Sequence, residues 1–337
     1  MIHTRFRILA AVLCAAAMQG PPLSPALADA YLADFPYPHD VSRIEFRSQG
    51  QELWMSYMDI APKAPNGRTV VLLHGKNFCG ATWESVIGAL SGAGYRVVVP
   101  DQVGFCRSAK PRAYQYSLHQ LAANTHALIE KLGMEKPIIL GHSMGGMLGI
   151  RYALMYPEQT AALVLVNPIG LEDWKAKGVP LVTIDDLYAR EKKTSAETIK
   201  KYQRNVYYHG NWRPAYDRWV DMLASMYAGK DGDIVAWSQA LTSDMVLSQP
   251  VIYEIGELKV PTLMLIGMKD TTAIGRDRAA PEAAKALGNY AALAPEVAGQ
   301  IKGSKLVTFP ELGHSPQVED PARFNAALVE SLGALLK

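Results

Sequence analysis

The sequence predicts an α/β fold built on a mostly parallel sheet, with an all-helical insertion between two parts of that sheet. Short apolar, β-branched runs alternate with helical segments from about residue 68 to 166, and again from residue 261 to the C-terminus. Continuous apolar runs are typical of strands covered on both faces, and their alternation with helices is typical of parallel crossovers. Between residues 170 and 260 the alternation stops and only helical patterns occur. With 337 residues, 49% of them hydrophobic, the chain is long enough to bury a full core.

The first thirty residues have the pattern of a secretory signal. Arg5 and Arg7 precede an apolar run at residues 8–18, which is too short to cross a bilayer as a stable helix. Prolines and the small-residue sequence Ala26-Leu27-Ala28 follow, so cleavage is expected after Ala28 or, second, after Ala30. A membrane anchor or a buried helix is the alternative interpretation. We expect an exported protein, periplasmic or secreted, without a membrane span in its mature form.

Charge and motif content exclude several classes of partner. The formal net charge is +2, and removal of Arg5 and Arg7 with the signal leaves the mature chain near zero. No stripe of Lys and Arg stands out, so nucleic acid is not expected as a partner. No metal-ligand spacing or nucleotide fingerprint occurs, so no metal or cofactor is expected. The residues predict no particular oligomeric state.

The elements follow in order from these patterns. A weakly marked strand at residues 44–47 is expected within an N-terminal part of the sheet that spans residues 31–60. Strands are then predicted at residues 69–73, 95–100, 137–140, 162–166, 261–266 and 305–309. Helices are predicted at residues 82–90, 116–132, 147–155 and 321–336, with glycines ending the first two.

The segment without strands predicts a lid over the sheet. Thr194 and Glu197 form a capping-box pattern ahead of a helix at residues 199–208. Pro214 suits the first turn of the next helix, and Gly229 its end. The predicted organisation is a signal peptide (1–28), the first part of the core (29–169), the helical lid (170–255) and the second part of the core (256–337).

A candidate nucleophile lies at Ser143. The sequence Gly141-His142-Ser143-Met144-Gly145 follows a predicted strand and opens a helix, which is the context that gives G-x-S-x-G its meaning. The small residues allow a sharp turn, and the helix aims N–H groups at a developing oxyanion. The alternative is a glycine-rich turn that only packs helix against strand.

A serine hydroxyl needs a base, and the base needs an orienting acid. His314 follows the strand at residues 305–309 and is the predicted base. His74 is the other candidate, but a histidine at the end of its strand more often braces the neighbouring loops. Asp270 follows the strand at residues 261–266 and is the predicted acid, with Asp173 as the alternative. All of these positions lie at strand ends, which meet at one edge of a parallel sheet.

The chain order Ser143, Asp270, His314, with His74-Gly75 and residues 101–108, resembles the lidded α/β-hydrolases from about residue 40 to the C-terminus. The resemblance implies an eight-stranded, mostly parallel sheet with the lid inserted after strand six. It also implies oxyanion donors at the Lys76 and Met144 N–H groups, with the Asn77 side chain as a further donor. Cys79 and Cys106 follow adjacent strands in that fold, so they form either a disulfide or two buried thiols.

Two departures from commoner patterns bear on the substrate. Residues 74–80 lack the His-Gly-Gly-Gly run of short-chain esterases, which favours a medium or long acyl group. A serine nucleophile disfavours the haloalkane dehalogenase and epoxide hydrolase branches. The predicted pocket is apolar. Phe78 is a candidate substrate contact, and the predicted lid is rich in Tyr188, Tyr202, Tyr207, Tyr208, Trp212, Trp219, Met222, Met226, Tyr227 and Trp237.

These residues predict a serine hydrolase that cleaves a small carboxylic ester with a hydrophobic acyl or alcohol part through an acyl-enzyme on Ser143. No cofactor is needed for this chemistry. The same triad acting on a lactone, an amide or a carbon–carbon bond is the first alternative. A ligand-binding protein without catalysis on the same fold is the remote one.

Overall fold

The computed structural model describes residues 29–337, and the predicted signal peptide lies outside this range. An eight-stranded sheet runs in the order β1-β2-β4-β3-β5-β6-β7-β8. β1 and β2 are antiparallel to their neighbours, and the other strand pairs are parallel. The strands are β1 (Val41–Ser48), β2 (Gln51–Ile60), β3 (Thr69–Leu73), β4 (Arg96–Pro100), β5 (Ile138–His142), β6 (Ala162–Val166), β7 (Thr262–Gly267) and β8 (Lys305–Phe309).

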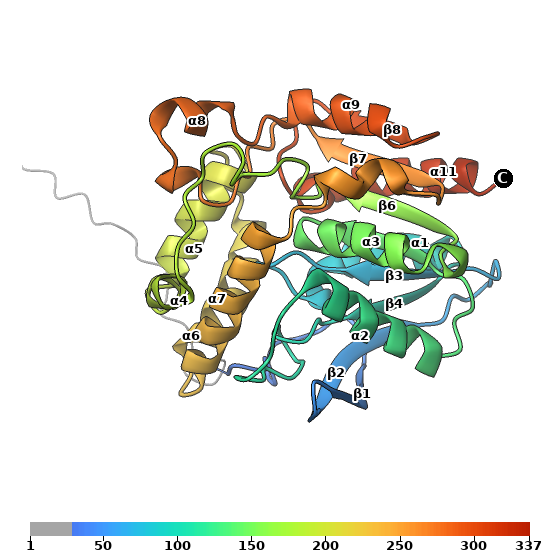
Figure 1. Cartoon of the computed structure of the whole chain (residues 1–337). Coiled ribbons are helices and arrows are strands. Elements are labelled where there is room, and N and C mark those ends of the chain that lie inside the picture. Colours follow the sequence, from blue (N-terminus) through green and yellow to red (C-terminus); the bar gives the residue numbers. More distant parts are fainter. Residues whose placement is uncertain (1–28) are drawn as a thin grey trace, which may run out of the picture.

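Helices cover both faces of the sheet (Figure 1). Alternate strand residues enter opposite cores: Val70 and Leu72 of β3 lie in one hydrophobic cluster, and Val71 and Leu73 in the other. This explains the near-continuous apolar runs in the sequence. One face is covered by α1 (Glu84–Gly92) and α11 (Pro321–Leu335), and the other by α2 (Leu118–Lys131), α3 (Met144–Met155) and α9 (Tyr290–Gln300).

The eight-stranded, mostly parallel sheet flanked by helices confirms the expected architecture. Every strand expected from an apolar run is present within a few residues of its predicted bounds. The N-terminal part of the sheet consists of two strands, of which β2 had no predicted bounds. Sequence patterns also did not predict α8 (Pro281–Ala286), which is only six residues long, or α9, which has Pro295 in its interior.

Between β6 and β7 the chain forms helices only, a segment that we call the insertion (residues 170–261). In Figure 1 the helices labelled α4 to α7 lie together at one end of the sheet. Its helices are α4 (Ile184–Glu191), α5 (Ala196–Tyr202), a π-helical turn (Gln203–Tyr207), short 3₁₀ turns (Pro214–Tyr216 and Ile252–Glu257), α6 (Asp217–Ala228) and α7 (Gly232–Ser248).

The capping box of the insertion differs from the predicted one. Ser195, rather than Thr194, is the N-cap of α5. The Ser195 hydroxyl accepts the Thr198 N–H, and the Thr198 hydroxyl accepts the Ser195 N–H, so Thr198 takes the part expected of Glu197. Regular α-helix then ends at Tyr202, where the chain enters the π-helical turn.

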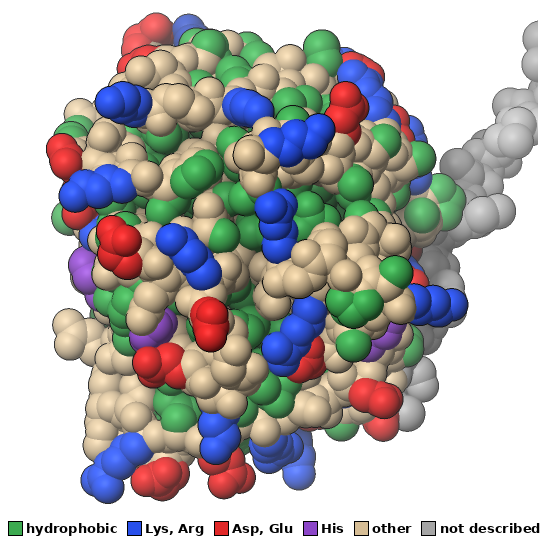
Figure 2. Space-filling model, turned by 90° about the vertical axis from the view of Figure 1, so that its right-hand side faces the viewer, with side chains coloured by type: hydrophobic (Ala, Val, Ile, Leu, Met, Phe, Trp, Pro, Cys, Tyr) green, Lys and Arg blue, Asp and Glu red, His purple; other side chains and the backbone are tan. Residues whose placement is uncertain are grey.

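The surface charge and the hydropathy of the helices agree with the near-zero net charge and moderate hydrophobicity of the sequence. On the face shown in Figure 2, basic and acidic side chains are interspersed, and neither charge forms a continuous patch. Over residues 29–337, none of the helices has the length and hydropathy that crossing a bilayer would require.

Candidate active site

Ser143 lies in a sharp turn between β5 and α3. Its backbone has φ 57° and ψ −121°, a combination that residues with a side chain seldom adopt. A Cβ on Gly141 would lie 2.0 Å from the Gly145 carbonyl oxygen, and one on Gly145 would lie 2.1 Å from the Leu73 carbonyl oxygen. Glycine is therefore required at both positions, since the turn brings backbone segments into direct contact.

The structure brings together the three side chains singled out from sequence. The His314 Nε2 lies 2.9 Å from the Ser143 Oγ, and its Nδ1 lies 2.7 Å from the Asp270 Oδ2. Each residue follows a strand, namely β5, β7 and β8, so all three converge at one edge of the sheet. With Nδ1–H donating to the carboxylate, Nε2 is left to accept the serine proton. The His314 side chain is fully buried and Ser143 is 4% exposed.

Asn167, which sequence reasoning missed, anchors Asp270. Its Nδ2 donates to the Asp270 Oδ2 at 3.0 Å and to the Gly267 carbonyl, while its Oδ1 accepts the Gly267 N–H. The Thr272 N–H donates to the other Asp270 oxygen at 2.8 Å. The alternative acid, Asp173, instead accepts from the Lys175 N–H and the Tyr253 hydroxyl. A buried Asn directly after the apolar run of β6 was the signal available in the sequence.

The loop that carries His314 is held from three sides. The His314 N–H donates to the Tyr207 carbonyl at 2.9 Å, and the two rings stack at 4.4 Å. Burial holds the pKa of His142 well below its usual value, so this ring is neutral and its Nε2 donates to the His314 carbonyl at 2.8 Å. The Glu319 carboxyl accepts the Gly313 N–H at 2.8 Å, and burial raises the pKa of Glu319 to about 7.

The loop after β3 lies against the nucleophile. A Cβ on Gly75 would approach the Ser143 Cβ to 2.9 Å. The neighbouring Lys76 N–H has no hydrogen-bond partner among residues 29–337. Met144 is the first residue of α3, and its N–H has no preceding turn to bond. Both groups are thus free to donate to a ligand, whereas the Asn77 amide donates to the Tyr207 hydroxyl at 2.9 Å.

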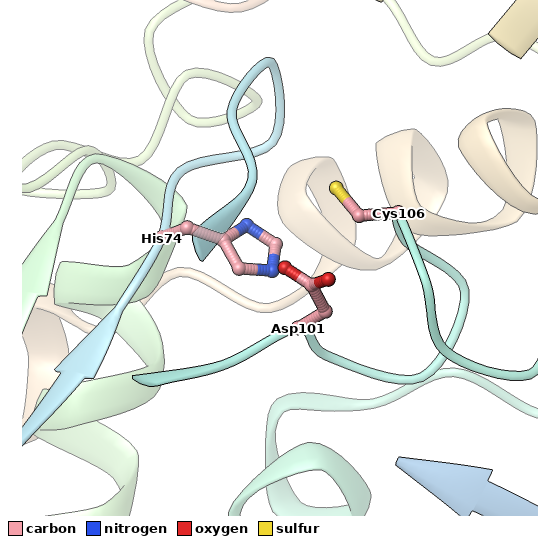
Figure 3. Close-up of side chains that lie close together, drawn as sticks. All are labelled: His74, Asp101 and Cys106. Carbon is pink, nitrogen blue, oxygen red and sulfur yellow. The ribbon is translucent and has the colours of Figure 1, made fainter. Parts of the chain in front are cut away.

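His74, Asp101 and Cys106 lie close together but do not form a metal site. Figure 3 shows the His74 ring beside the Asp101 carboxylate, and the three ligand-type atoms lie within 4.8 Å of one another. The His74 Nε2 accepts the Gln102 N–H and its Nδ1 donates to the Gly75 carbonyl. The Asp101 oxygens accept the Gly80 N–H and the Tyr37 hydroxyl. The cluster therefore braces the loops after β3 and β4.

The Cys106 sulfur is joined to Cys79 in a disulfide, with a Cα–Cα distance of 5.8 Å. It is not available as a thiolate ligand. The bond ties the loop that follows β3, which carries Lys76, to the loop that follows β4.

A cavity of about 300 Å³ lies between the loop after β3 and the insertion. Ser143 is not among its lining residues, but Lys76 and Asn77 of the adjoining loop are. The cavity is lined by Lys76, Asn77, Phe105, Cys106, Glu191, Thr194, Thr198, Ile199, Tyr202, Gln203, Leu223, Met226, Tyr227, Gln239, Ser243, Val246 and Ile274.

Three candidate substrate contacts do not line this cavity. Phe78 is buried between the rings of His142 and Tyr207, at centroid distances of 5.0 and 5.8 Å. Trp212 packs against Tyr208 and Tyr216, and Trp219 against Phe35. Phe78 and Trp219 thus join the insertion to the rest of the protein, whereas Trp212 packs within the insertion. Of the aromatic and methionine side chains expected to form the pocket, only Tyr202, Met226 and Tyr227 line it.

Comparisons with known proteins agree with this geometry. A family model described as the alpha/beta hydrolase fold matches residues 68–321. The crystal structure of a probable hydrolytic enzyme from Pseudomonas aeruginosa PAO1 is 57% identical, with a TM-score of 0.90 over 92% of this chain and 99% of that one. A 2-hydroxy-6-oxononadienedioate/2-hydroxy-6-oxononatrienedioate hydrolase from Comamonas testosteroni is 26% identical over 80% of this chain and 89% of its own length. A 2-hydroxy-6-oxo-6-phenylhexa-2,4-dienoate hydrolase from Burkholderia cepacia is 27% identical over the same shares.

Proposed function

The chain belongs to the alpha/beta hydrolase fold family, and we propose that it is a serine hydrolase of carboxylic esters with a hydrophobic acyl or alcohol part. The observation that carries the proposal is the continuous hydrogen-bonded path from the Ser143 Oγ through His314 to Asp270. A serine in a strained turn, an imidazole aligned on its oxygen and a buried acid behind the imidazole are what activation of a serine requires.

The mechanism follows from the positions of these atoms. The Ser143 Oγ attacks the carbonyl carbon while the His314 Nε2 takes the hydroxyl proton, and Asp270 stabilises the imidazolium. The Lys76 and Met144 N–H groups hold the oxyanion, and one such donor typically lowers the barrier by about 2.7 to 4 kcal/mol. His314 then protonates the leaving alcohol, activates a water molecule and so releases the acid.

The insertion supports an apolar substrate. Ile199, Leu223, Met226 and Val246 give the cavity apolar walls beside the Lys76 loop. We assign residues 170–255 as a lid over the site, with residues 29–169 and 256–337 as the two parts of the core. In this arrangement the acyl or alcohol part lies under the lid while the carbonyl reaches Ser143.

Cleavage of a carbon–carbon bond by the same triad is the second candidate. The names of the relatives from Comamonas testosteroni and Burkholderia cepacia, which align over most of this chain, describe hydrolases of 2-hydroxy-6-oxo acids rather than of esters. Lactones and amides would use the same residues, because each presents a carbonyl to the serine.

A p-nitrophenyl ester series from acetate to laurate, run on residues 29–337 beside Ser143→Ala, tests the proposal. We expect turnover by the native protein, best with medium or long acyl chains, and a loss of at least about 10⁴-fold in the variant. Turnover that persists in Ser143→Ala would refute Ser143 as nucleophile. If no ester is cleaved but a fluorophosphonate still labels Ser143, the hypothesis of carbon–carbon or lactone cleavage replaces that of ester cleavage.

We also propose that residues 1–28 are a signal peptide and that the mature protein is periplasmic or secreted. The Cys79–Cys106 disulfide supports this location, because such bonds persist in oxidising compartments and are rare in the cytosol. A mature N-terminus at Asp29, found by mass spectrometry of the exported protein, is the expected result.

A further inference from the structure

Gln203 is a buried residue in the wall of the cavity whose side-chain amide has no partner within residues 29–337. Its side chain is fully buried, and within residues 29–337 neither its Oε1 nor its Nε2 has a hydrogen-bond partner. It lines the cavity beside Lys76 and Asn77. An unpaired buried polar group costs about 1–3 kcal/mol, so native proteins seldom keep one without a use.

Gln203 begins an uncommon backbone hydrogen-bonding pattern. Gln203 is the first residue of the π-helical turn Gln203–Tyr207, and such turns inside helices are frequent at functional sites. The same turn ends at Tyr207, whose carbonyl accepts the His314 N–H and whose ring stacks on His314. The turn thus joins a cavity-lining amide to the loop of the proposed base.

The charges in the cavity compensate one another. Lys76 and Glu191 are the two ionised side chains that line it, and the Lys76 Nζ lies 3.0 Å from a Glu191 oxygen. The other Glu191 oxygen accepts the Tyr227 hydroxyl at 2.8 Å. Because this pair is already neutral and hydrogen-bonded, a charged group on a ligand would be buried without a countercharge.

We propose that Gln203 is a specificity-determining residue that binds a neutral group able both to donate and to accept hydrogen bonds, best met by a carboxamide, on an otherwise apolar acyl chain. The inference rests on ester cleavage at Ser143. A glutamine amide presents a carbonyl acceptor beside N–H donors, so a substrate amide pairs with it reciprocally. A plain alkyl chain leaves both atoms unpaired, and a site built to hydrogen-bond disfavours such a substrate.

Two isosteric esters test the inference: p-nitrophenyl 6-amino-6-oxohexanoate and p-nitrophenyl 6-methylheptanoate, each with homologues one methylene shorter and longer. We expect kcat/KM of the native protein to favour the best amide ester over its alkyl isostere about tenfold or more. In Gln203→Met the amide ester loses about tenfold and the alkyl ester gains, which reverses the order. Gln300→Met, the same change at an exposed residue of α9, leaves the ratio at its native value.

The outcomes separate this inference from the proposed function. Fluorophosphonate labelling of Ser143 and turnover of p-nitrophenyl acetate report on the nucleophile alone, and loss of both would refute the proposed function. If both are present and the native protein shows no preference for any amide ester, the role of Gln203 is refuted. An amide preference that Gln203→Met leaves unchanged refutes it equally. Should Gln203→Met fail to fold, Gln203→Leu, which also lacks the amide, is compared with the native protein in the same way.

Discussion

Ser143 is held in a conformation that a side chain makes costly. Residues in sparsely populated backbone regions cost about 1–3 kcal/mol each, and they persist where the surrounding structure fixes them. Glycine would relieve that strain, although it adds about 0.4–1 kcal/mol of unfolded-state entropy relative to alanine. We therefore expect Ser143→Gly to be about 1 kcal/mol more stable than Ser143→Ala, with both inactive. Urea unfolding measures the difference, and a Ser143→Gly variant less stable than Ser143→Ala by the entropy cost of glycine would show that the turn is not strained.

Glu319 gives the fold a dependence on pH. Burial raises the pKa of Glu319 to about 7, so the folded state binds this proton more tightly than the unfolded chain does. Its contribution is fully present below the unfolded pKa near 4.5 and is lost as the pH rises through about 7. His209, with its Nε2 3.5 Å from the carboxylate, is the nearest cationic candidate, but burial lowers the pKa of His209 and Lys269 opposes its protonation.

We expect Glu319→Gln to flatten the stability profile between pH 5 and 8. Relative to the native protein the variant should gain unfolding free energy with rising pH, on the order of 2–3 kcal/mol over the window. Thermal unfolding of both proteins at several pH values provides the measurement. Parallel profiles for the two proteins would mean that Glu319 is ionised in the folded state across the range.

For single residues, the sequence predicts those whose side-chain type suits catalysis. It does not predict those whose role depends on contacts made only in the folded protein. Ser143, Asp270 and His314 could be picked out because each follows an apolar strand and has a side chain suited to acyl transfer. Asn167 and Glu319 have ordinary side chains, and their roles become visible only from the groups that they contact in the fold, Asp270 and the His314 loop. Phe78 is a candidate substrate contact by sequence, but its ring packs in an aromatic cluster with Tyr207, Tyr208 and Tyr216.

At the scale of elements, β6 and β7 are locked together at the end that carries the acid. Asn167 follows β6 and bonds both the N–H and the carbonyl of Gly267, the last residue of β7, as well as Asp270. Asn167→Ala removes the side-chain partner of the Gly267 N–H and leaves the Gly267 carbonyl with the Asp270 N–H as its donor, with an expected loss of about 2 kcal/mol in unfolding free energy. It also frees Asp270 to turn, so we expect kcat on an ester to fall at least about tenfold.

The matched control for that prediction is Asn325→Ala on α11, whose amide donates to the Ser85 carbonyl away from the site. This variant should lose some stability and retain kcat. If Asn167→Ala behaves in the same way, Asn167 holds the strands and does not position the acid.

How well an element could be predicted from the sequence depended on its surroundings in the fold. Strands buried on both faces leave a continuous apolar run, so β3 and β6 could be bounded to the residue. The N-cap of α5 was wrong by one residue because Thr194 and Ser195 are equally good caps by type. The π-helical turn had no sequence signal, since the contact between Tyr207 and the His314 backbone that accompanies it is made across the fold.

At the scale of the molecule, the rhythm of strands and helices was enough to give the architecture, including the point where the helical insertion enters. It was not enough to give the cavity, whose walls combine the loops after β3 and β4 with the insertion. Ion pairing between Lys76 and Glu191 connects these parts across 115 positions of sequence. No local pattern predicts such a contact.

The disulfide links the stability of the whole molecule to the compartment in which it folds. Cys79 and Cys106 are 27 positions apart, and the chain-entropy relation gives about 3 to 4 kcal/mol for closing a loop of that size. We expect the double variant Cys79→Ser and Cys106→Ser to lose about that much unfolding free energy, and esterase activity to fall as well, because the bond braces the loop that carries Lys76.

Urea unfolding of residues 29–337 with and without reductant measures the loss in the native sequence, while the double variant should not respond to reductant. Mass spectrometry of exported protein should find no free thiol. Two free thiols in that material, or equal unfolding midpoints with and without reductant, would show that the stability of the protein does not depend on this disulfide. The disulfide would then no longer support the proposal of export.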